Sequence, residues 1–366
     1  MRVLHSATRV LTLAALAALA VGCSKDSNGP EDSPFDPAGT SSDLSAVNSS
    51  FDSPALLSFD AASDEISLTT GGAAALALQA RPTAALATGG KASAMRYAGA
   101  LAKALSRGPH PSLAVAAAAI PPDLLGTTFV YDVSVQHYAA SDLTGAPANG
   151  VRFLLYAVNP VTGVPTEPLT EVGYVDVVTI QTSSSASVNI VVVSDNKTYL
   201  DYSAKITANS STSGTIGVSG YVTNGQDRVN FDLDNHVTFG DNTMDLTLDY
   251  VLTVPTRGGF RIDLEADATT SDVTNNTTVN LDLTAQGQHG TVRITGSETN
   301  GTGTFQVKVN GALFATIDVT AGSQATVTGK DGQSLTADEQ AALEDVFSMF
   351  GGGLAFFVGL GPIPAF

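Results

Sequence analysis

The amino-acid sequence predicts a mainly β protein. We expect one large, curved antiparallel meander, half-barrel or barrel-like, packed on a C-terminal helix and an apolar tail. Three observations lead to this fold. Apolar and polar residues alternate along many segments after Gly126, turn signals rich in Gly and Asn separate these segments, and the intervening stretches are too short for crossover helices.

The alternation is clearest in the segments 129–136, 245–254, 260–267 and 279–284. In such a segment, successive side chains point to opposite faces of a sheet, which gives one dry face and one wet face. We expect about a dozen strands between Thr127 and Val319, and a sheet of that width curls because its strands twist.

The C-terminal segment predicts a helix over 337–350. Thr336 and Glu339 have the spacing of a capping box. Four apolar residues that follow share one helical face, and Gly351 begins a glycine run that ends the pattern. These four candidate residues for the core or for ligand contact are Leu343, Val346, Phe347 and Phe350. The apolar tail 354–366 must also be covered, so we expect the β domain, 123–366, to wrap its apolar face around helix and tail.

The first residues predict an export signal. Two arginines and no acid precede the apolar run 10–21, which is too short to span a bilayer. The run ends in Leu-Ala-Val-Gly-Cys at Cys23, which resembles the lipobox of bacterial lipoproteins. The resemblance concerns residues 1–23 alone. It implies that 1–22 is removed, that Cys23 carries the lipid, including palmitate, and that Ser24 directs the protein to the outer membrane of the cell envelope.

Two further segments precede the β domain. Residues 23–65 are rich in Ser, Asp, Pro and Gly, which predicts a flexible tether. Residues 66–122 are Ala-rich, contain five basic residues and no acid, and predict a partly helical segment. This segment would lie on anionic lipid, dock on the acidic body of the protein, or act as a plain linker.

Composition and charge argue against several classes of protein. The formal net charge of −18 disfavours nucleic-acid binding, because such a surface repels phosphate backbones. A single cysteine excludes an intrachain disulfide and a cysteine-based zinc site. The sequence lacks a His-Glu-x-x-His motif, a P-loop and a nucleophile elbow. We therefore expect a protein that is not an enzyme.

Acidic residues at strand spacing are the one sequence feature that could bind a metal ion or act as acid and base. Two groups, Asp232 with Asp234, and Asp263 with Glu265 and Asp267, would each lie on one face of the sheet. The favoured interpretation is a solvated outer face that supplies solubility. The other two are a Ca²⁺ site, since Ca²⁺ takes carboxylate oxygens, and the acid and base of a glycosidase. Apart from Ca²⁺, the sequence predicts no cofactor.

Three functions compete at this stage. The first is a non-catalytic carrier that binds an apolar small molecule or lipid on the concave face of the sheet, in outline like the half-barrel lipoproteins that shuttle lipids. The second is a structural or adhesive surface protein without a cavity. The third is an outer-membrane β-barrel, since alternation alone does not separate lipid-facing strands from soluble ones.

Overall fold

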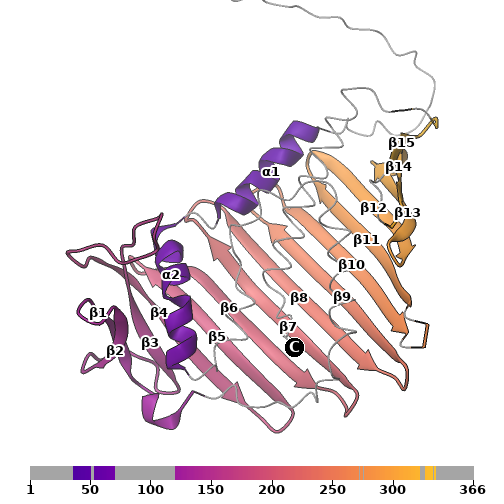
Figure 1. Ribbon diagram of the computed structural model, residues 1–366. Helices are drawn as coiled ribbons and strands as arrows, with labels where there is room; N and C mark the ends of the chain where they lie inside the picture. Colours follow the sequence, from indigo (N-terminus) through magenta and orange to yellow (C-terminus); the bar gives the residue numbers. More distant parts are fainter. Residues whose placement is uncertain are drawn as a thin grey trace, which may run out of the picture. The chain divides into compact units, whose positions relative to one another are not determined.

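A computed structural model describes residues 36–50, 53–70, 120–271, 273–274, 276–321, 326–332 and 334 of the chain. All of them belong to one compact unit, Ser33–Phe366. The described part is mainly β, as predicted, with one sheet and two α-helices (Figure 1). Cys23, the predicted helix 337–350 with Leu343, Val346, Phe347 and Phe350, and the apolar tail lie outside the described residues.

The helices are α1 (Pro37–Ser49) and α2 (Pro54–Thr69), and a short 3-10 turn, η2 (Pro122–Leu124), precedes the sheet. The strands are β1 (Thr128–Asp132), β2 (His137–Ser141), β3 (Gly150–Tyr156), β4 (Glu171–Gln181), β5 (Ser185–Ser194), β6 (Lys197–Ala208), β7 (Ser213–Thr223), β8 (Arg228–Phe239), β9 (Thr243–Val254), β10 (Phe260–Ser271), β11 (Asn276–Gly287), β12 (Gly290–Thr299), β13 (Thr302–Val309), β14 (Ala312–Val319) and β15 (Thr326–Gly329).

The strands pair in chain order from β3 to β15, and β1 and β2 complete the sheet beyond β3. Within the described residues the sheet is open, with β2 and β15 as its edges. All pairs are antiparallel except β1 with β3, which is parallel. The prediction of a wholly antiparallel sheet is therefore wrong at this edge. The reason is that the β1–β2 hairpin inserts β1 between β2 and β3, so β2 and its loop serve as the connection.

Alternation correctly predicted the two faces of the sheet. Along β9 and β10 every second side chain is buried, and the side chains between them are exposed or half-buried. The segment 129–136 is the exception, because β1 ends at Asp132. The side chain of Asp132 accepts hydrogen bonds from the backbone N and hydroxyl of Ser134, at 2.8 and 2.6 Å. Gln136 has a φ of 58°, which reverses the chain into β2.

The predicted flexible tether over 23–65 is wrong where α1 and α2 form. Ser53 caps α2: its side chain accepts a hydrogen bond from the backbone N of Leu56, and Pro54 follows in the first turn. Phe59 and Ile66 are buried on the sheet side of the helix. The Ser-rich composition concealed a helix that is stabilised by this burial more than by its intrinsic propensity.

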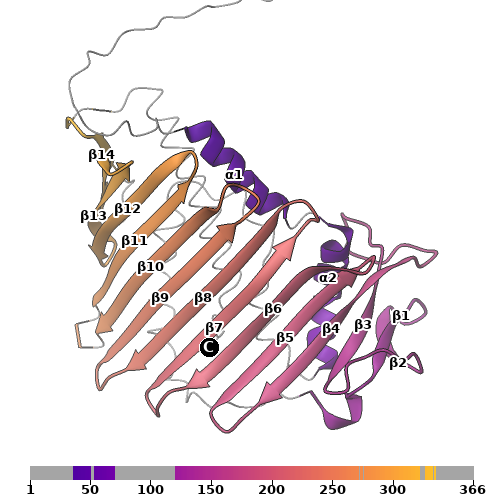
Figure 2. The same ribbon diagram turned by 180° about the vertical axis from the view of Figure 1, so that it is seen from behind.

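Helix α1 lies along one end of the strands (Figures 1 and 2). The backbone N of Asp36 donates to the carbonyl of His289, at 2.9 Å, and the side chain of Asn224 donates to the carbonyl of Ser49, at 3.0 Å. We call this end of the sheet the α1 end. It carries the connections 133–136, 157–170, 195–196, 224–227, 255–259, 288–289 and 310–311. The remaining turns lie at the opposite end.

Candidate functional site

The apolar face of the sheet is continuous from β3 to β14. Its inward side chains form one hydrophobic cluster together with residues of α1 and α2. Representative residues on successive strands are Leu233, Leu252, Leu264, Leu283, Ile294 and Phe305, all 4% exposed or less. We call the part on β7–β14 the distal apolar face.

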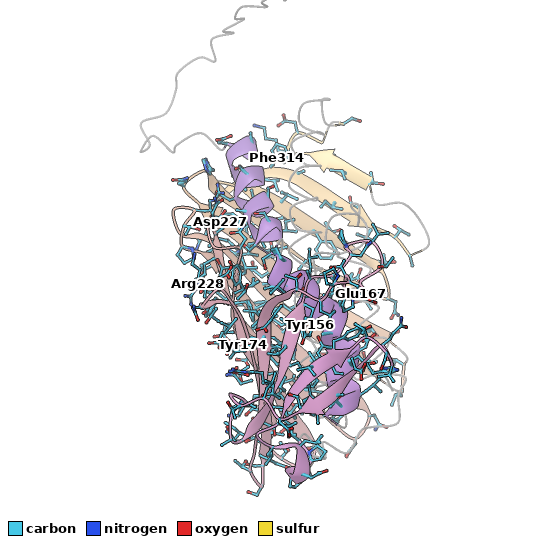
Figure 3. The ribbon with its side chains drawn as sticks, turned by 90° about the vertical axis from the view of Figure 1, so that its left-hand side faces the viewer. Tyr156, Glu167, Tyr174, Asp227, Arg228 and Phe314 are labelled. Carbon is cyan, nitrogen blue, oxygen red and sulfur yellow. The ribbon has the colours of Figure 1, made fainter. Side chains whose placement is uncertain are left out.

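Helix α2 packs on the other part of this face, over β2–β6. Beneath it, Phe129 and Phe153 stack with ring centroids 4.7 Å apart, and Tyr138 meets Phe153 edge to face. Burial raises the pKa of Tyr138, whose hydroxyl donates to the carbonyl of Leu154 at 2.9 Å. Figure 3 shows α2 on one side of the strands and Arg228 on the other. The extensive contacts of α2 end at β6, so this helix does not account for the burial of the distal apolar face.

Acidic side chains gather on the opposite, outer face. All five residues that the sequence singled out lie there, on β8 and β10, and β9 and β11 contribute three more. We call this surface the acidic face; it consists of Asp232, Asp234, Asp245, Asp249, Asp263, Glu265, Asp267 and Asp282.

Strand register turns part of the acidic face into a row. Asp234 lies opposite Asp249, Asp249 lies opposite Glu265, and Glu265 lies opposite Asp282. Four carboxylates thus follow one another across β8–β11. Like charges directly opposite each other destabilise a sheet, so the row works against the fold unless its charge is compensated.

Arginine side chains neutralise some carboxylates of the acidic face but not others. Arg293 forms a bidentate ion pair with Asp282, and Arg261 forms one with Asp263. Within the described residues, Asp234, Asp249 and Glu265 form no ion pair.

Asp232 lies beside the row and is partly buried. Burial, followed by the charges of Asp234 and Asp249, raises the pKa of its carboxyl. No three His, Cys, Asp or Glu side chains in the described part come close enough together to hold a metal ion. Calcium binding by Asp232, Asp234, Asp263, Glu265 and Asp267 therefore stays a prediction from the sequence.

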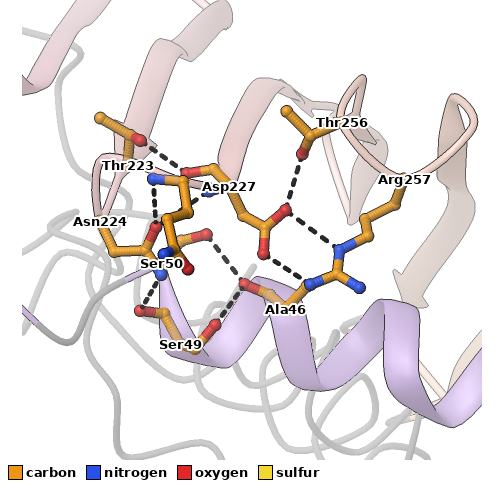
Figure 4. A network of polar contacts seen from close by, with 9 residues as sticks. Ala46, Ser49, Ser50, Thr223, Asn224, Asp227, Thr256 and Arg257 are labelled. Atoms are coloured by element: carbon orange, nitrogen blue, oxygen red, sulfur yellow. Dashed lines mark hydrogen bonds and ion pairs between the residues drawn. The ribbon is translucent and has the colours of Figure 1, made fainter.

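A polar network links the end of α1 to the turn 224–227, and that turn to the turn 255–259 (Figure 4). Asp227 is 8% exposed and binds Arg257 through both oxygens, at 3.0 and 2.8 Å, and it also accepts a hydrogen bond from Thr256 at 2.8 Å. These bonds, that from Arg257 first, lower the pKa of Asp227. Asn224, in the same turn, binds the C-terminal end of α1.

His289 lies between two aspartates of the α1 segment. Its Nδ1 is 3.2 Å from Oδ2 of Asp36, and its Nε2 is 3.8 Å from Oδ2 of Asp43. Burial raises the pKa of Asp43, whose Oδ2 accepts no hydrogen bond from a described residue. We assign this group to the attachment of α1, because it joins the α1 segment to the β11–β12 turn.

Sequence reasoning found the acidic face but missed the α1 attachment. The network joins residues near 45, 225 and 257, and His289 adds a fourth segment. No local pattern connects them, because the contacts depend on how hairpin turns line up at one end of the sheet. A usable signal was the Asp-Pro pair at Asp36, which marks the start of α1; its side chain accepts a hydrogen bond from the backbone N of Gly39 at 3.0 Å.

No family model matches the chain, and no curated protein or solved structure is similar to it. Among the described residues, none of the helices is long and apolar enough to cross a membrane.

Proposed function

We propose that this protein is a non-catalytic lipoprotein of the cell envelope that binds an apolar ligand. In this proposal Cys23 carries the lipid that anchors the protein to the outer membrane, and the distal apolar face binds an apolar small molecule or the acyl chain of a lipid. The sheet curves around this face as a half-barrel, because a sheet of this width twists.

One observation carries the proposal. The distal apolar face is as fully buried as the face under α2, although the extensive contacts of α2 stop at β6. Burial of an apolar side chain the size of Leu is favourable by about 2 kcal/mol. The chain itself covers the distal apolar face, so an apolar ligand would bind there by displacing that cover. Two occupants compete: an apolar ligand, and the chain's own C-terminal segment with Leu343, Val346, Phe347 and Phe350.

Native mass spectrometry separates the two occupants. The chain from residue 23 onward, with Cys23→Ser, is purified without detergent and examined for additional mass. A co-purified apolar molecule supports the proposal and gives the ligand class. A ligand-free monomer contradicts it and leaves the C-terminal segment as the occupant.

A matched pair of variants locates the bound molecule. Ala266 lies on β10 and is 5% exposed on the distal apolar face. Thr247 lies on β9 and is exposed on the outer face. Ala266→Phe fills space on the apolar side and should lower ligand occupancy, whereas Thr247→Phe should not. Circular dichroism and thermal unfolding check that both variants fold. Equal occupancy in both would place the ligand elsewhere.

The anchor has its own test. Metabolic labelling with a palmitate analogue should label the wild-type chain and leave Cys23→Ser unlabelled. If the wild-type chain stayed unlabelled, the result would contradict the lipoprotein part of the proposal and would leave the ligand-binding part unaffected.

A structural or adhesive surface protein is the second candidate. The observation that favours it is the carboxylate row, since Asp234, Asp249 and Glu265 form no ion pair in the described part of the chain and would attract a cationic partner. This candidate needs no ligand cavity, so a ligand-free monomer in the mass spectrum favours it.

A further inference from the structure

We propose that the ligand of the distal apolar face is a cationic amphiphile, whose protonated amine pairs with the carboxylate of Glu298. This inference rests on the proposed binding of an apolar ligand and adds the chemical class of that ligand. Three features of the described residues lead to it: the place of Glu298 in the sheet, its lack of a partner, and the residues around it.

Strand register places Glu298 on the inward side of β12. Val292 and Ile294 are buried on the same strand, and Glu298 continues their even spacing next to the last residue of β12. It lies opposite Val279 of β11, which is buried on the distal apolar face. On the strands β7–β14, all of which the structure describes, Glu298 is the one charged residue at an inward position.

Glu298 also differs from the other buried polar side chains of this face. Asn235 on β8 and Thr270 on β10 are buried there as well. Asn235 accepts a hydrogen bond from the hydroxyl of Tyr250, and the hydroxyls of Thr270 and Thr277 are 3.1 Å apart. Glu298 is 8% exposed, and within the described ranges it forms no ion pair and no side-chain hydrogen bond.

An unpaired carboxylate on an apolar face determines which head group binds beside it. Burial raises the pKa of Glu298, because the ionised carboxylate loses hydration without gaining a partner. The protein carries this cost before any ligand binds. A protonated amine compensates it through a charge-assisted hydrogen bond, a neutral hydroxyl compensates less, and a carboxylate adds a second negative charge. The net charge of −18 acts in the same direction, since it attracts cations to the protein.

The surroundings of Glu298 suit an amine that is followed by a hydrocarbon chain. Gly303 lies opposite Glu298 on β13, and no side chain fits there, because a Cβ would lie 2.5 Å from Cα of Glu298. Strand β13 therefore presents no side chain beside the carboxylate. Towards the α1 end, Ile294 and Phe305 continue the apolar face and are buried. A head group at Glu298 would thus place its chain along apolar side chains.

Three dodecyl compounds test the inference. The chain from residue 23 onward, with Cys23→Ser, is purified without ligand. Isothermal titration calorimetry at pH 7 then measures the dissociation constants of dodecylamine, dodecanol and dodecanoate, each below the concentration at which it aggregates. The three compounds share one hydrocarbon chain, so differences between their affinities report the head group.

Two variants locate the effect. Glu298→Gln removes the inward carboxylate and keeps the length of the side chain. Asp318→Asn is the matched control: Asp318 is exposed on the outer face of β14, and asparagine keeps an acceptor for the hydroxyl of Thr304 while it removes the same charge. Circular dichroism checks that both variants fold, and the comparison of the three compounds on the wild type needs no variant.

We expect dodecylamine to bind the wild type about tenfold or more tightly than dodecanol, because hydrogen bonds to charged groups are the stronger ones. Dodecanoate should bind most weakly. Glu298→Gln should reduce the affinity for dodecylamine to about that for dodecanol, whereas Asp318→Asn should keep the preference of the wild type.

Several outcomes would overturn the inference. They are equal affinities of the wild type for the amine and the alcohol, a preference for the amine that persists in Glu298→Gln, and a preference that Asp318→Asn lowers by the same factor. If dodecanol binds in these cases, the proposed binding of an apolar ligand still stands. Failure of all three compounds to bind would overturn the inference and would contradict the proposed function as well.

Discussion

Asp249 on β9 lies directly opposite Glu265 on β10, so two carboxylates face each other across an antiparallel strand pair. Asp234 continues the row on one side and Asp282 on the other. Arg293 compensates Asp282 at one end. The centre of the row therefore places like charges directly opposite each other, which is unfavourable for the sheet.

Removal of the central charge should stabilise the protein. In Glu265→Gln, the repulsion from both Asp249 and Asp282 disappears while the side-chain length is kept. We expect the free energy of unfolding to rise by about 0.5 to 1 kcal/mol at low salt, and the gain to shrink in concentrated salt. Thermal unfolding at two ionic strengths measures this.

Asp241→Asn is the control for that variant, because Asp241 is exposed in the β8–β9 turn, away from the row. Its melting temperature should stay close to that of the wild type. Destabilisation by Glu265→Gln would contradict the prediction and would indicate that a bound cation already neutralises the row.

The sequence predicted the faces of the strands but not their neighbours. Period-two alternation assigned Asp263 and Glu265 to the outer face, since side chains alternate wherever a strand forms. The opposition of Asp249 and Glu265 depends on the register of β9 and β10, which the turn 255–259 sets. That register does not follow from either strand alone.

The helices were missed for a different reason. Residues 37–69 are rich in small polar side chains, and an isolated helix of that length is marginal in water. Burial of Ile66 and Phe59 against the sheet stabilises α2, and that contact is not visible in the local sequence. Similarly, Val133 and Val135 continue the alternation of β1, but the hydrogen bonds of Asp132 to Ser134 turn the chain instead.

The role of α2 as part of the core gives a second prediction. Ile66 is fully buried, whereas Leu68 on the same helix is 75% exposed. Ile66→Ala should lower the free energy of unfolding by about 3 kcal/mol, through lost burial and a residual cavity. Leu68→Ala should change it by less than about 0.5 kcal/mol. Urea unfolding of both variants tests this, and equal effects would mean that α2 is not docked as described.

The ion pair between Asp227 and Arg257 gives a third prediction. Arg257→Ala removes the hydrogen bonds that lower the pKa of Asp227 and leaves that buried carboxylate with Thr256. We expect the melting temperature at pH 7 to fall by a few degrees. Lys197→Ala, at the start of β6, is the control and should have little effect.

The pH dependence of this pair has a defined sign. Because the folded-state pKa of Asp227 lies below its unfolded value of 3.8, the stabilisation is present above that value and is lost as the pH falls through the folded pKa. The difference between wild type and Arg257→Ala should therefore be largest at neutral pH and should diminish below about pH 4. A difference that is constant from pH 7 to pH 3 would refute the electrostatic explanation.

Glu298 gives a fourth prediction with the opposite sign. It lies on β12, on the same inward side as Val292 and Ile294, and is 8% exposed. Burial raises the pKa of its carboxyl above the ordinary 4.5. The favourable contribution of the protonated group is complete below pH 4.5 and is lost as the pH rises through the folded-state pKa, so the ionised group costs stability at pH 7.

Glu298→Gln should therefore stabilise the protein at pH 7, on the order of 1 kcal/mol, and the gain should vanish when the pH falls below 4.5. Thermal unfolding across pH 3 to 8 measures both effects, with Glu167→Gln in the exposed β3–β4 loop as the control. A loss of stability at pH 7 would show instead that the ionised carboxylate has a cationic partner, and the ligand on the distal apolar face would then be examined for an amine.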